Sequence, residues 1–268
     1  MFVDSHCHLS FPELRERLPE IRAAMAAARV DRALVICTTI EEFDAVQAIA
    51  ASHHGFWCSV GVHPDNLEVH EPTLEELCDL ARRDRVVAIG ETGLDYYRLG
   101  DRSVADMEWQ RERFRTHIRA ARATGLPLVV HTRSAGDDTL TILAEEGAEA
   151  AGGVFHCFTE TEAVARGALD LGFHISFSGI LTFRNAQELR EVARFVPLDR
   201  CLIETDSPYL APVPFRGKVN SPAYVPYVAQ ALADLKGIGL DAVAEATSRN
   251  FDQLFRIREQ SADGRGNS

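Results

Sequence analysis

Long apolar runs are absent from this sequence. No uninterrupted apolar stretch among its 268 residues approaches the roughly 18 residues needed to cross a bilayer, so we expect no membrane association. The opening MFVDSHCH has no basic segment, and Asp4, His6 and His8 interrupt it at once. This beginning is not typical of a secretory signal peptide.

Cysteine is also sparse. The chain has six cysteines and no CxxC pair, and several lie in apolar runs such as ALVICTT and CLIET. Such a pattern is typical of reduced, buried thiols. We therefore expect a cytoplasmic protein without a disulfide framework.

Positive charge is scarce as well. The sequence has 28 Lys and Arg against 40 Asp and Glu, which gives a net charge of −12. Tight non-specific binding to duplex nucleic acid needs a basic surface and is not expected, although metal ions could hold such a substrate locally. Apolar residues make up 46% and charged residues 25%, which excludes disorder for most of the chain. The length fits one large α/β barrel or two small domains.

Eight short apolar runs recur along the chain, each followed by a segment of helical pattern. Near-continuous apolar runs are typical of parallel strands that are covered on both faces. The segment 103–124 has helical spacing and stops at Gly125, and Thr73 to Glu76 has the spacing of a capping box. The predicted strands are 2–6, 33–38, 56–62, 86–91, 127–131, 153–158, 173–178 and 201–206.

This strand–helix alternation predicts an α/β fold with a single (β/α)8 TIM-type barrel. We assign residues 1–258 to one barrel domain and expect residues 259–268 to form a flexible tail. An open doubly wound sheet is the competing architecture. No run after the first predicted strand matches GxGxxG or GxxxxGK[ST], which disfavours that alternative.

Polar residues gather at the ends of the predicted strands. Barrel enzymes build their sites at the C-terminal ends of the strands, and five of the ten histidines fall there. The strand-end residues are His6, His8, Thr38, Thr39, His63, Glu91, His131, His156, Ser178 and Asp206.

Six of these residues predict a metal centre. His6 and His8 are two positions apart, so both imidazoles face the same side of a strand and Cys7 faces the other. A carboxylate at Glu91 could bridge two cations. Imidazole and carboxylate ligands suit zinc, manganese, nickel or iron, and magnesium less obviously. Each residue alone could be a core or turn residue, but together we expect them to bind metal: His6, His8, Glu91, His131, His156 and Asp206.

Two other kinds of catalysis are disfavoured. Cys7 and Cys157 each neighbour a histidine, but adjacent residues of a strand face opposite sides, so neither thiol shares a face with that imidazole. The sequence also lacks the GxSxG elbow of many serine hydrolases.

Several motifs in this chain resemble those of the TatD-family metal-dependent hydrolases, the TatD DNases. They are DSHCHL, GVHP, GETGLDYY, PLVVHTR, HCF, ISFSGILTFRNA, ETDSPYLAPVPFRGKVN and SRNFDQLF. The similarity runs from residue 4 to about 257 and is closest to the YcfH branch. It implies a metallo-dependent hydrolase-like barrel with two divalent ions, one held by His6, His8, Glu91 and Asp206 and the other by Glu91, His131 and His156.

The remaining functional residues follow from the chemistry of such a centre. Asp206 is our expected general base, and Glu204 is expected to support a ligating imidazole. His63 is expected to contact a phosphate or to protonate the leaving oxygen, and Arg133 to bind phosphate. Tyr96, or its neighbour Tyr97, is expected to present an aromatic face to a base.

These expectations lead to a metal-dependent phosphodiesterase of deoxyribonuclease type. The DNA substrate is expected to be single-stranded or a short end, because the acidic chain disfavours long duplexes. No obligate protein partner is evident. Two alternatives remain: a small-molecule amide or ester hydrolase of the amidohydrolase-like superfamily, and a metal-binding scaffold that has lost turnover. Related cyclic-amide hydrolases commonly bridge their metals with a carboxylated lysine where this chain has Glu91, which disfavours the first.

Overall fold

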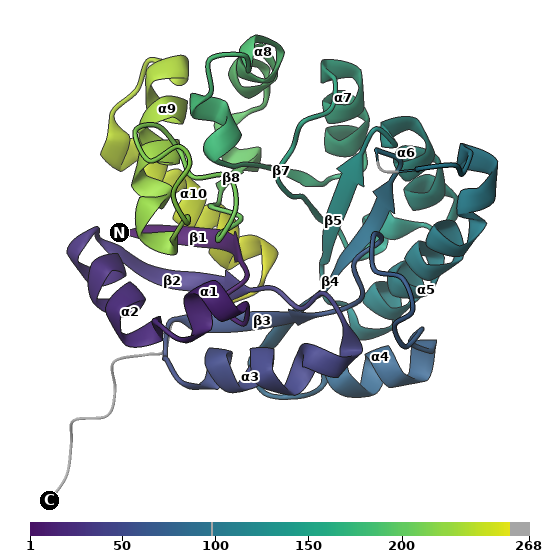
Figure 1. Ribbon diagram of the computed structural model, residues 1–268. Helices are drawn as coiled ribbons and strands as arrows, with labels where there is room; N and C mark the ends of the chain where they lie inside the picture. The colour runs from purple at the N-terminus through teal and green to yellow at the C-terminus, as the bar shows by residue number, and fades with distance from the viewer. Residues whose placement is uncertain (98, 258–268) are drawn as a thin grey trace, which may run out of the picture.

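The computed structural model describes residues 1–97 and 99–257, and its strands form one parallel sheet in the order β1 to β8. Helices surround this sheet on the outside (Figure 1), which confirms the predicted TIM-type barrel. The strands are β1 (Phe2–Cys7), β2 (Val30–Val35), β3 (Phe56–Val60), β4 (Val86–Asp95), β5 (Leu128–Arg133), β6 (Gly153–Phe155), β7 (His174–Phe177) and β8 (Cys201–Ile203).

Several strand boundaries differ from the expected ones. β2 begins and ends three residues earlier than expected, at Val30 and Val35, and β3 ends at Val60 instead of residue 62. β4 does not stop at Glu91 but continues to Asp95, because the segment after Glu91 keeps pairing with β5. β6 and β8 end earlier than expected, at Phe155 and Ile203. The polar residues after these two strands therefore leave the ladder and lie in the loops at the barrel mouth.

The main helices alternate with the strands, and short 3-10 turns join several of them. The helices are α1 (Pro12–Arg15), α2 (Leu18–Ala27), α3 (Phe43–Ala51), α4 (Leu74–Ala81), α5 (Glu108–Thr124), α6 (Gly136–Glu145), α7 (Glu162–Asp170), α8 (Gln187–Phe195), α9 (Val225–Lys236) and α10 (Leu240–Leu254). The 3-10 turns are η1 (Ile40–Glu42), η2 (Val104–Met107), η3 (Ala148–Ala150), η4 (Gly179–Thr182), η5 (Leu198–Arg200) and η6 (Pro222–Tyr224).

Two expected helix ends were tested by the structure. Gly125 ends α5 in the left-handed conformation, with φ of 70°, as expected for a residue without Cβ. Thr73 caps α4 by accepting a hydrogen bond from the backbone N–H of Glu76. The carboxylate of Glu76 lies 2.7 Å from His70 Nε2, so the reciprocal half of the expected capping box is replaced by an ion pair.

Backbone hydrogen bonds between the end of β1 and the segment after β8 close the barrel. The backbone N–H of Asp206 donates to the carbonyl of His6 (3.0 Å), and the N–H of His8 donates to the carbonyl of Ser207 (2.8 Å). These two bonds bring the HxH segment of β1 against the residues that follow β8. The first and last thirds of the chain thus meet at one point of the barrel mouth.

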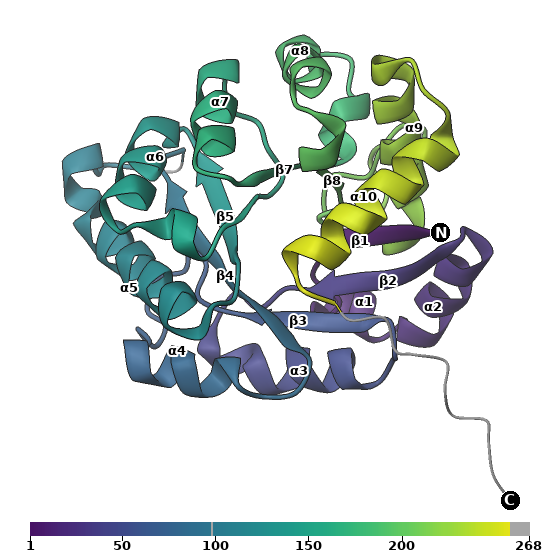
Figure 2. The same cartoon turned by 180° about the vertical axis from the view of Figure 1, so that it is seen from behind.

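The interior of the barrel is filled with apolar side chains and closed at one end by α10. Phe251 and Phe255 of this helix are buried against the interior residues, and Figure 2 shows α10 crossing the barrel on the side from which β1 starts. The helix therefore seals the end opposite to the strand-end loops. The interior residues are Val3, Leu34, Ile36, Ala88, Val129, Val154 and Leu202.

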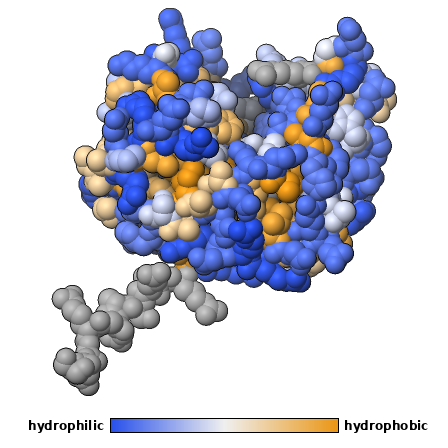
Figure 3. Space-filling view, turned by 60° about the horizontal axis from the view of Figure 1, so that its bottom comes forward, coloured by the Kyte–Doolittle hydropathy of each residue, from blue (hydrophilic) through white to orange (hydrophobic). Residues whose placement is uncertain are grey.

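A second, larger apolar layer lies between the strands and the helices around them. The outer surface is mainly hydrophilic on the face shown in Figure 3, with hydrophobic residues visible between the polar ones. Among residues 1–97 and 99–257, no helix is both long and apolar enough to cross a membrane. The expected tail at residues 259–268 lies outside the described residues.

Phe251→Ala tests whether α10 stabilises the barrel by sealing it. We expect the free energy of unfolding to fall by about 3–5 kcal/mol, because a fully buried ring is removed and a cavity remains. Denaturant unfolding measures this change. Ile238→Ala, at a site 37% exposed, is the control, and equal stability of the two variants would contradict the sealing role.

Candidate metal centre and active site

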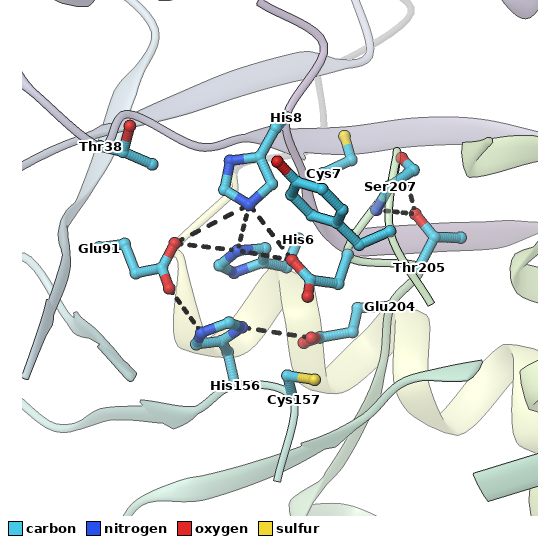
Figure 4. A network of polar contacts seen from close by, with 12 residues as sticks. His6, Cys7, His8, Thr38, Glu91, His156, Cys157, Glu204, Thr205 and Ser207 are labelled. Atoms are coloured by element: carbon cyan, nitrogen blue, oxygen red, sulfur yellow. Dashed lines mark hydrogen bonds and ion pairs between the residues drawn. The ribbon is translucent and has the colours of Figure 1, made fainter. Parts of the chain in front are cut away.

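A cavity of ≈ 730 Å³ opens at the C-terminal ends of the strands. His6 lies fully buried at its base, and the side chains around it point toward one another in Figure 4. Of the residues expected from the sequence, the cavity is lined by His8, Thr38, His63, Glu91, Arg133, His131, His156 and Asp206. Residues from distant parts of the chain thus share one space.

Glu91 places one carboxylate oxygen beside the imidazoles of β1. Its Oε2 lies 3.3 Å from His6 Nε2 and 3.9 Å from His8 Nε2. Asp206 completes this group, because its Oδ1 lies 3.2 Å from His8 Nε2 and 3.6 Å from His6 Nε2. Two carboxylates and two imidazoles therefore converge on one small volume, which we name the first cluster.

The other oxygen of Glu91 faces a second group of imidazoles. Its Oε1 lies 2.8 Å from His156 Nε2, 3.2 Å from His131 Nδ1 and 3.3 Å from His63 Nε2. We name these three histidines and Glu91 the second cluster. Glu91 belongs to both clusters, and its side chain is 2% exposed.

Two further carboxylates determine where the histidine protons lie. His131 Nε2 is 3.1 Å from Asp95 Oδ2, and His156 Nδ1 is 3.3 Å from Glu204 Oε1. Each carboxylate accepts the N–H of its imidazole, so the other ring nitrogen, which faces Glu91, can bind a cation through its lone pair once it is deprotonated. Without a cation, the effect of burial is outweighed by Glu91 and Glu204 at His156 and by Asp95 and Glu91 at His131, and the pKa of both imidazoles is raised. This carboxylate–histidine arrangement orients metal-ligating imidazoles in proteins.

His63 has the opposite proton placement. The backbone N–H of Asp65 donates to His63 Nδ1 at 3.0 Å, so a neutral His63 carries its proton on Nε2. Burial lowers the pKa of His63 and outweighs the charge of Glu91, which favours the neutral form. His63 therefore offers an N–H donor to the cavity, whereas His131 and His156 can offer lone pairs to a bound cation.

Helix α5 holds the loop that carries His63. Gln110, Arg113 and His117 lie on its buried face, and each bonds to backbone atoms of residues 62–66. The ring Nε2 of His117 accepts an N–H from this loop, and burial lowers the pKa of His117 to about 4. From the sequence, His117 stands apart from the strand ends, but the structure places it directly behind the site.

The charge balance of the clusters fits divalent cations. Burial alone would raise the pKa of Glu91, but His156, His63 and His6 outweigh it and hold this pKa well below its usual range. In the same way, the bond from His8 outweighs the burial of Asp206 and lowers its pKa. Both carboxylates are ionised and need positive charge.

An unpartnered carboxylate oxygen points to the same conclusion. Among the described residues, Glu91 Oε2, which faces the first cluster, is buried and has no hydrogen-bond partner. Three groups of ligand atoms also lie within 4.8 Å of one another: His6, His156 and Asp206; His6, His8 and Glu91; and His63, Glu91 and His131. The donors present are those that bind divalent transition metals.

Arg133 lines the cavity, and Tyr97 lies beside it. The guanidinium of Arg133 lies over the ring of Tyr97, 3.7 Å from its centre, and Tyr97 is 60% exposed. The expectation for Tyr96 is corrected. Its ring is 8% exposed and its hydroxyl donates to Asp138 at 2.8 Å, so packing and this bond turn it away from the cavity, and Tyr97 is the tyrosine that faces outward.

The environment of the thiols near the site disfavours their thiolate form. Burial raises the pKa of Cys7 and of Cys157 well above the usual range, and nearby carboxylates raise both further. Cys157 Sγ contacts Ser178 Oγ at 3.2 Å rather than a histidine. This geometry agrees with the sequence argument against a cysteine nucleophile.

Sequence reasoning missed Asp95 because it ended the fourth strand at Glu91. A signal was present, since residues four apart on one strand face the same side, and Asp95 follows Glu91 at that spacing. Glu204 was expected to support an imidazole, and the structure places it beside His156.

Glu91→Gln tests the position of this residue between the clusters. We expect total bound metal to fall, because the amide weakens both groups of ligands, whereas His131→Ala should affect chiefly one of them. Elemental analysis of the purified proteins measures the content. Asp65→Asn, which removes another carboxylate from the same cavity, is the control; metal content in Glu91→Gln equal to that of the control would refute the shared role.

Asp95→Asn tests the orientation of His131. The amide can present N–H instead of oxygen to His131 Nε2, which favours a proton on Nδ1 and removes the lone pair that faces Glu91. We expect metal affinity to fall about 10–100-fold, as measured by competition with a chelating dye. Asp138→Asn, which alters the nearby bond to Tyr96, should leave it unchanged, and an unchanged affinity in Asp95→Asn would rule out the orienting role.

Comparisons with known proteins agree with this geometry. The family model for TatD related DNase matches residues 3–256. The metal-dependent hydrolase YcfH of Escherichia coli K12 is 48% identical over 259 residues, which cover 95% of this chain and 96% of the relative. The 3'-5' ssDNA/RNA exonuclease TatD of Escherichia fergusonii is 33% identical over 237 residues, or 86% and 90% of the two chains.

A solved structure shares the whole architecture. The TatD homologue YJJV of Escherichia coli K12 superposes with a TM-score of 0.89 at 30% sequence identity and covers 96% of this chain and 98% of its own. The motifs, the fold and the histidine–carboxylate clusters agree with the family match over nearly the whole length. The chain belongs to the TatD family of metal-dependent hydrolases.

Proposed function

We propose that this protein is a deoxyribonuclease-type phosphodiesterase that hydrolyses DNA at single-stranded or short ends. The observation that carries the proposal is the position of Glu91, whose two oxygens face two separate groups of ligands inside one cavity. Such an arrangement suits two divalent ions, which stabilise both the attacking and the leaving oxygen of a phosphoryl group. The relative named as an ssDNA/RNA exonuclease supports the choice of substrate.

The proposed ligands are those whose lone pairs or carboxylate oxygens face the clusters. His6, His8, Glu91 and Asp206 would hold one ion, and Glu91, His131 and His156 the other. When bound, the ions would supply a nucleophilic water near neutral pH and offset the negative charge of the phosphate. The proton placement at His131 and His156 supports their role as ligands.

Asp206 is the proposed general base. Its side chain is 15% exposed at the edge of the first cluster, so water can reach it, and its lowered pKa keeps it ionised. A carboxylate within hydrogen-bond reach of the attacking water can take its proton. Glu91 is buried more deeply and is better suited to hold ions than to exchange protons with water.

His63 and Arg133 are the proposed substrate contacts. A neutral His63 with its proton on Nε2 is a hydrogen-bond donor rather than an acid, so binding a phosphate oxygen is favoured over protonation of the leaving group. Arg133 provides a planar cation at the rim for a phosphate oxygen. Tyr97 beneath it provides an exposed ring for a base.

We also propose a cytoplasmic location. All six cysteines are free thiols, and Cys7, Cys37, Cys58 and Cys201 are buried. Free, buried thiols are typical of proteins from reducing compartments.

Asp206→Asn tests the mechanism. The substitution keeps the shape of the side chain and removes its basicity, so turnover of a short single-stranded DNA oligomer should fall about 10²–10⁴-fold. Single-turnover cleavage at saturating metal measures the chemical step apart from metal binding. Asp65→Asn, at another carboxylate of the cavity, should keep nearly wild-type turnover, and an equally active Asp206→Asn would remove Asp206 from the mechanism.

The choice of substrate is tested on the wild-type protein. Metal-reconstituted enzyme is assayed with a DNA oligomer, an RNA oligomer and a cyclic amide of equal concentration. We expect the highest kcat/KM on DNA. Hydrolysis of the amide with both oligomers left intact would replace the nuclease by a small-molecule hydrolase, and no turnover of any substrate would favour a metal-binding scaffold.

A further inference from the structure

The loops around the cavity mouth carry opposite charges on its two sides. After β3, the loop of residues 61–73 contains three carboxylates and no Lys or Arg, and α4 contains three more. After β7 and β8, residues 177–187 and 207–233 contain no Asp or Glu. They contain the cations Arg184, Arg216 and Lys218. In a chain with a net charge of −12, this acid-free region is a local exception.

The two acid-free loops contact each other. The guanidinium carbon of Arg216 lies 3.6 Å from the centre of the Phe183 ring, and the backbone N–H of Val213 donates to Thr182 Oγ1 at 3.0 Å. We name residues 179–187 and 207–219 the basic rim. Its three cations are exposed, and none of them forms an ion pair with a carboxylate of the described residues.

The basic rim is continuous with the cavity. Ile180, Tyr209 and Leu210 belong to the rim and also line the cavity. Tyr209 is 55% exposed and meets the ring of Phe11 edge-on at 6.2 Å. The basic rim therefore begins at the cavity, and its cations Arg216 and Lys218 lie over the rings of Phe183 and Phe215.

This arrangement matches what a flexible polyanion requires. Proteins that bind single strands combine aromatic rings, on which bases stack, with cations that follow the backbone. On the opposite side of the mouth, the loop after β3 carries Asp65 and Glu68, whose negative charge disfavours a phosphate backbone there. A duplex would need a wider basic surface than these three cations supply.

We infer that the basic rim binds the part of a single-stranded nucleic acid that extends beyond the cavity. Arg184, Arg216 and Lys218 contact its phosphates, and Tyr209 stacks on the base nearest the cavity. The inference rests on the proposed phosphodiesterase function and assigns the direction in which the bound strand leaves the site.

The test compares a long and a short substrate. The double variant Arg216→Ala/Lys218→Ala and wild-type enzyme, both metal-loaded, are assayed on a single-stranded DNA 12-mer and on a dinucleotide with the same end. We expect KM for the 12-mer to rise at least about tenfold. The logarithm of the association constant, plotted against the logarithm of the salt concentration, should have a slope shallower by about 1.4, because each lost phosphate contact removes about 0.7 in single strands. The dinucleotide, with a single phosphodiester, should keep its kcat/KM.

The control removes the same charge from the other end of the barrel. Arg29→Ala/Arg249→Ala alters residues that surround Met1 at the start of β1, and both KM values should stay as in wild type. A wild-type KM and salt slope for the 12-mer in the Arg216/Lys218 variant would overturn the inference. Equal losses on the 12-mer and the dinucleotide would also overturn it, because the variant would then damage the cavity.

Direct binding separates the inference from the proposed function. Fluorescence anisotropy measures the affinity of a labelled 12-mer for both proteins without cleavage. If wild-type protein binds the 12-mer but cleaves no nucleic acid, and the double variant binds at least tenfold more weakly, the proposed function fails and the rim stands. If a poly-glutamate peptide of equal charge binds wild type as tightly as the 12-mer, the assignment to nucleic acid fails.

Discussion

The carboxylate of Glu91 is the group on which the site depends. A buried, ionised carboxylate is unfavourable unless positive charge or hydrogen-bond donors surround it. Five imidazoles meet this need, and they surround both oxygens of Glu91, with the rings of His6 and His156 stacked 3.8 Å apart. The remaining architecture brings those imidazoles to one carboxylate and keeps them oriented.

The barrel does this by joining distant parts of the chain. Backbone bonds between His6 and Asp206 close the sheet, and the carboxylate of buried Asp4 accepts hydrogen bonds from Thr205 in the same region. On the other side, α5 holds the loop of His63 through three buried side chains. Because α10 seals the far end, the mouth is the one end of the barrel left for a substrate in the part of the chain described.

Local charge reconciles the acidic chain with the proposed polyanionic substrate. The net charge of −12 disfavours general attraction to DNA, so binding has to come from local features. The clusters would attract a phosphate through bound cations, Arg133 adds a charge at the rim, and the basic rim continues this path outward. Positive charge that is confined to the cavity and the basic rim favours single strands and ends over long duplexes, which agrees with the proposed substrate.

The sequence by itself determined the barrel and the gathering of the six expected ligands at its mouth, because apolar strands alternate with helices and polar residues follow the strands. It did not determine the length of β4, which backbone pairing with β5 extends to Asp95, nor the proton positions on His63, His131 and His156, which depend on partners far away in the chain. It also left Tyr96 and Tyr97 indistinguishable, and packing decided that Tyr97 faces the cavity rim. Local pattern encodes which residues reach the mouth, whereas hydrogen bonds between strands and loops decide what each residue does there.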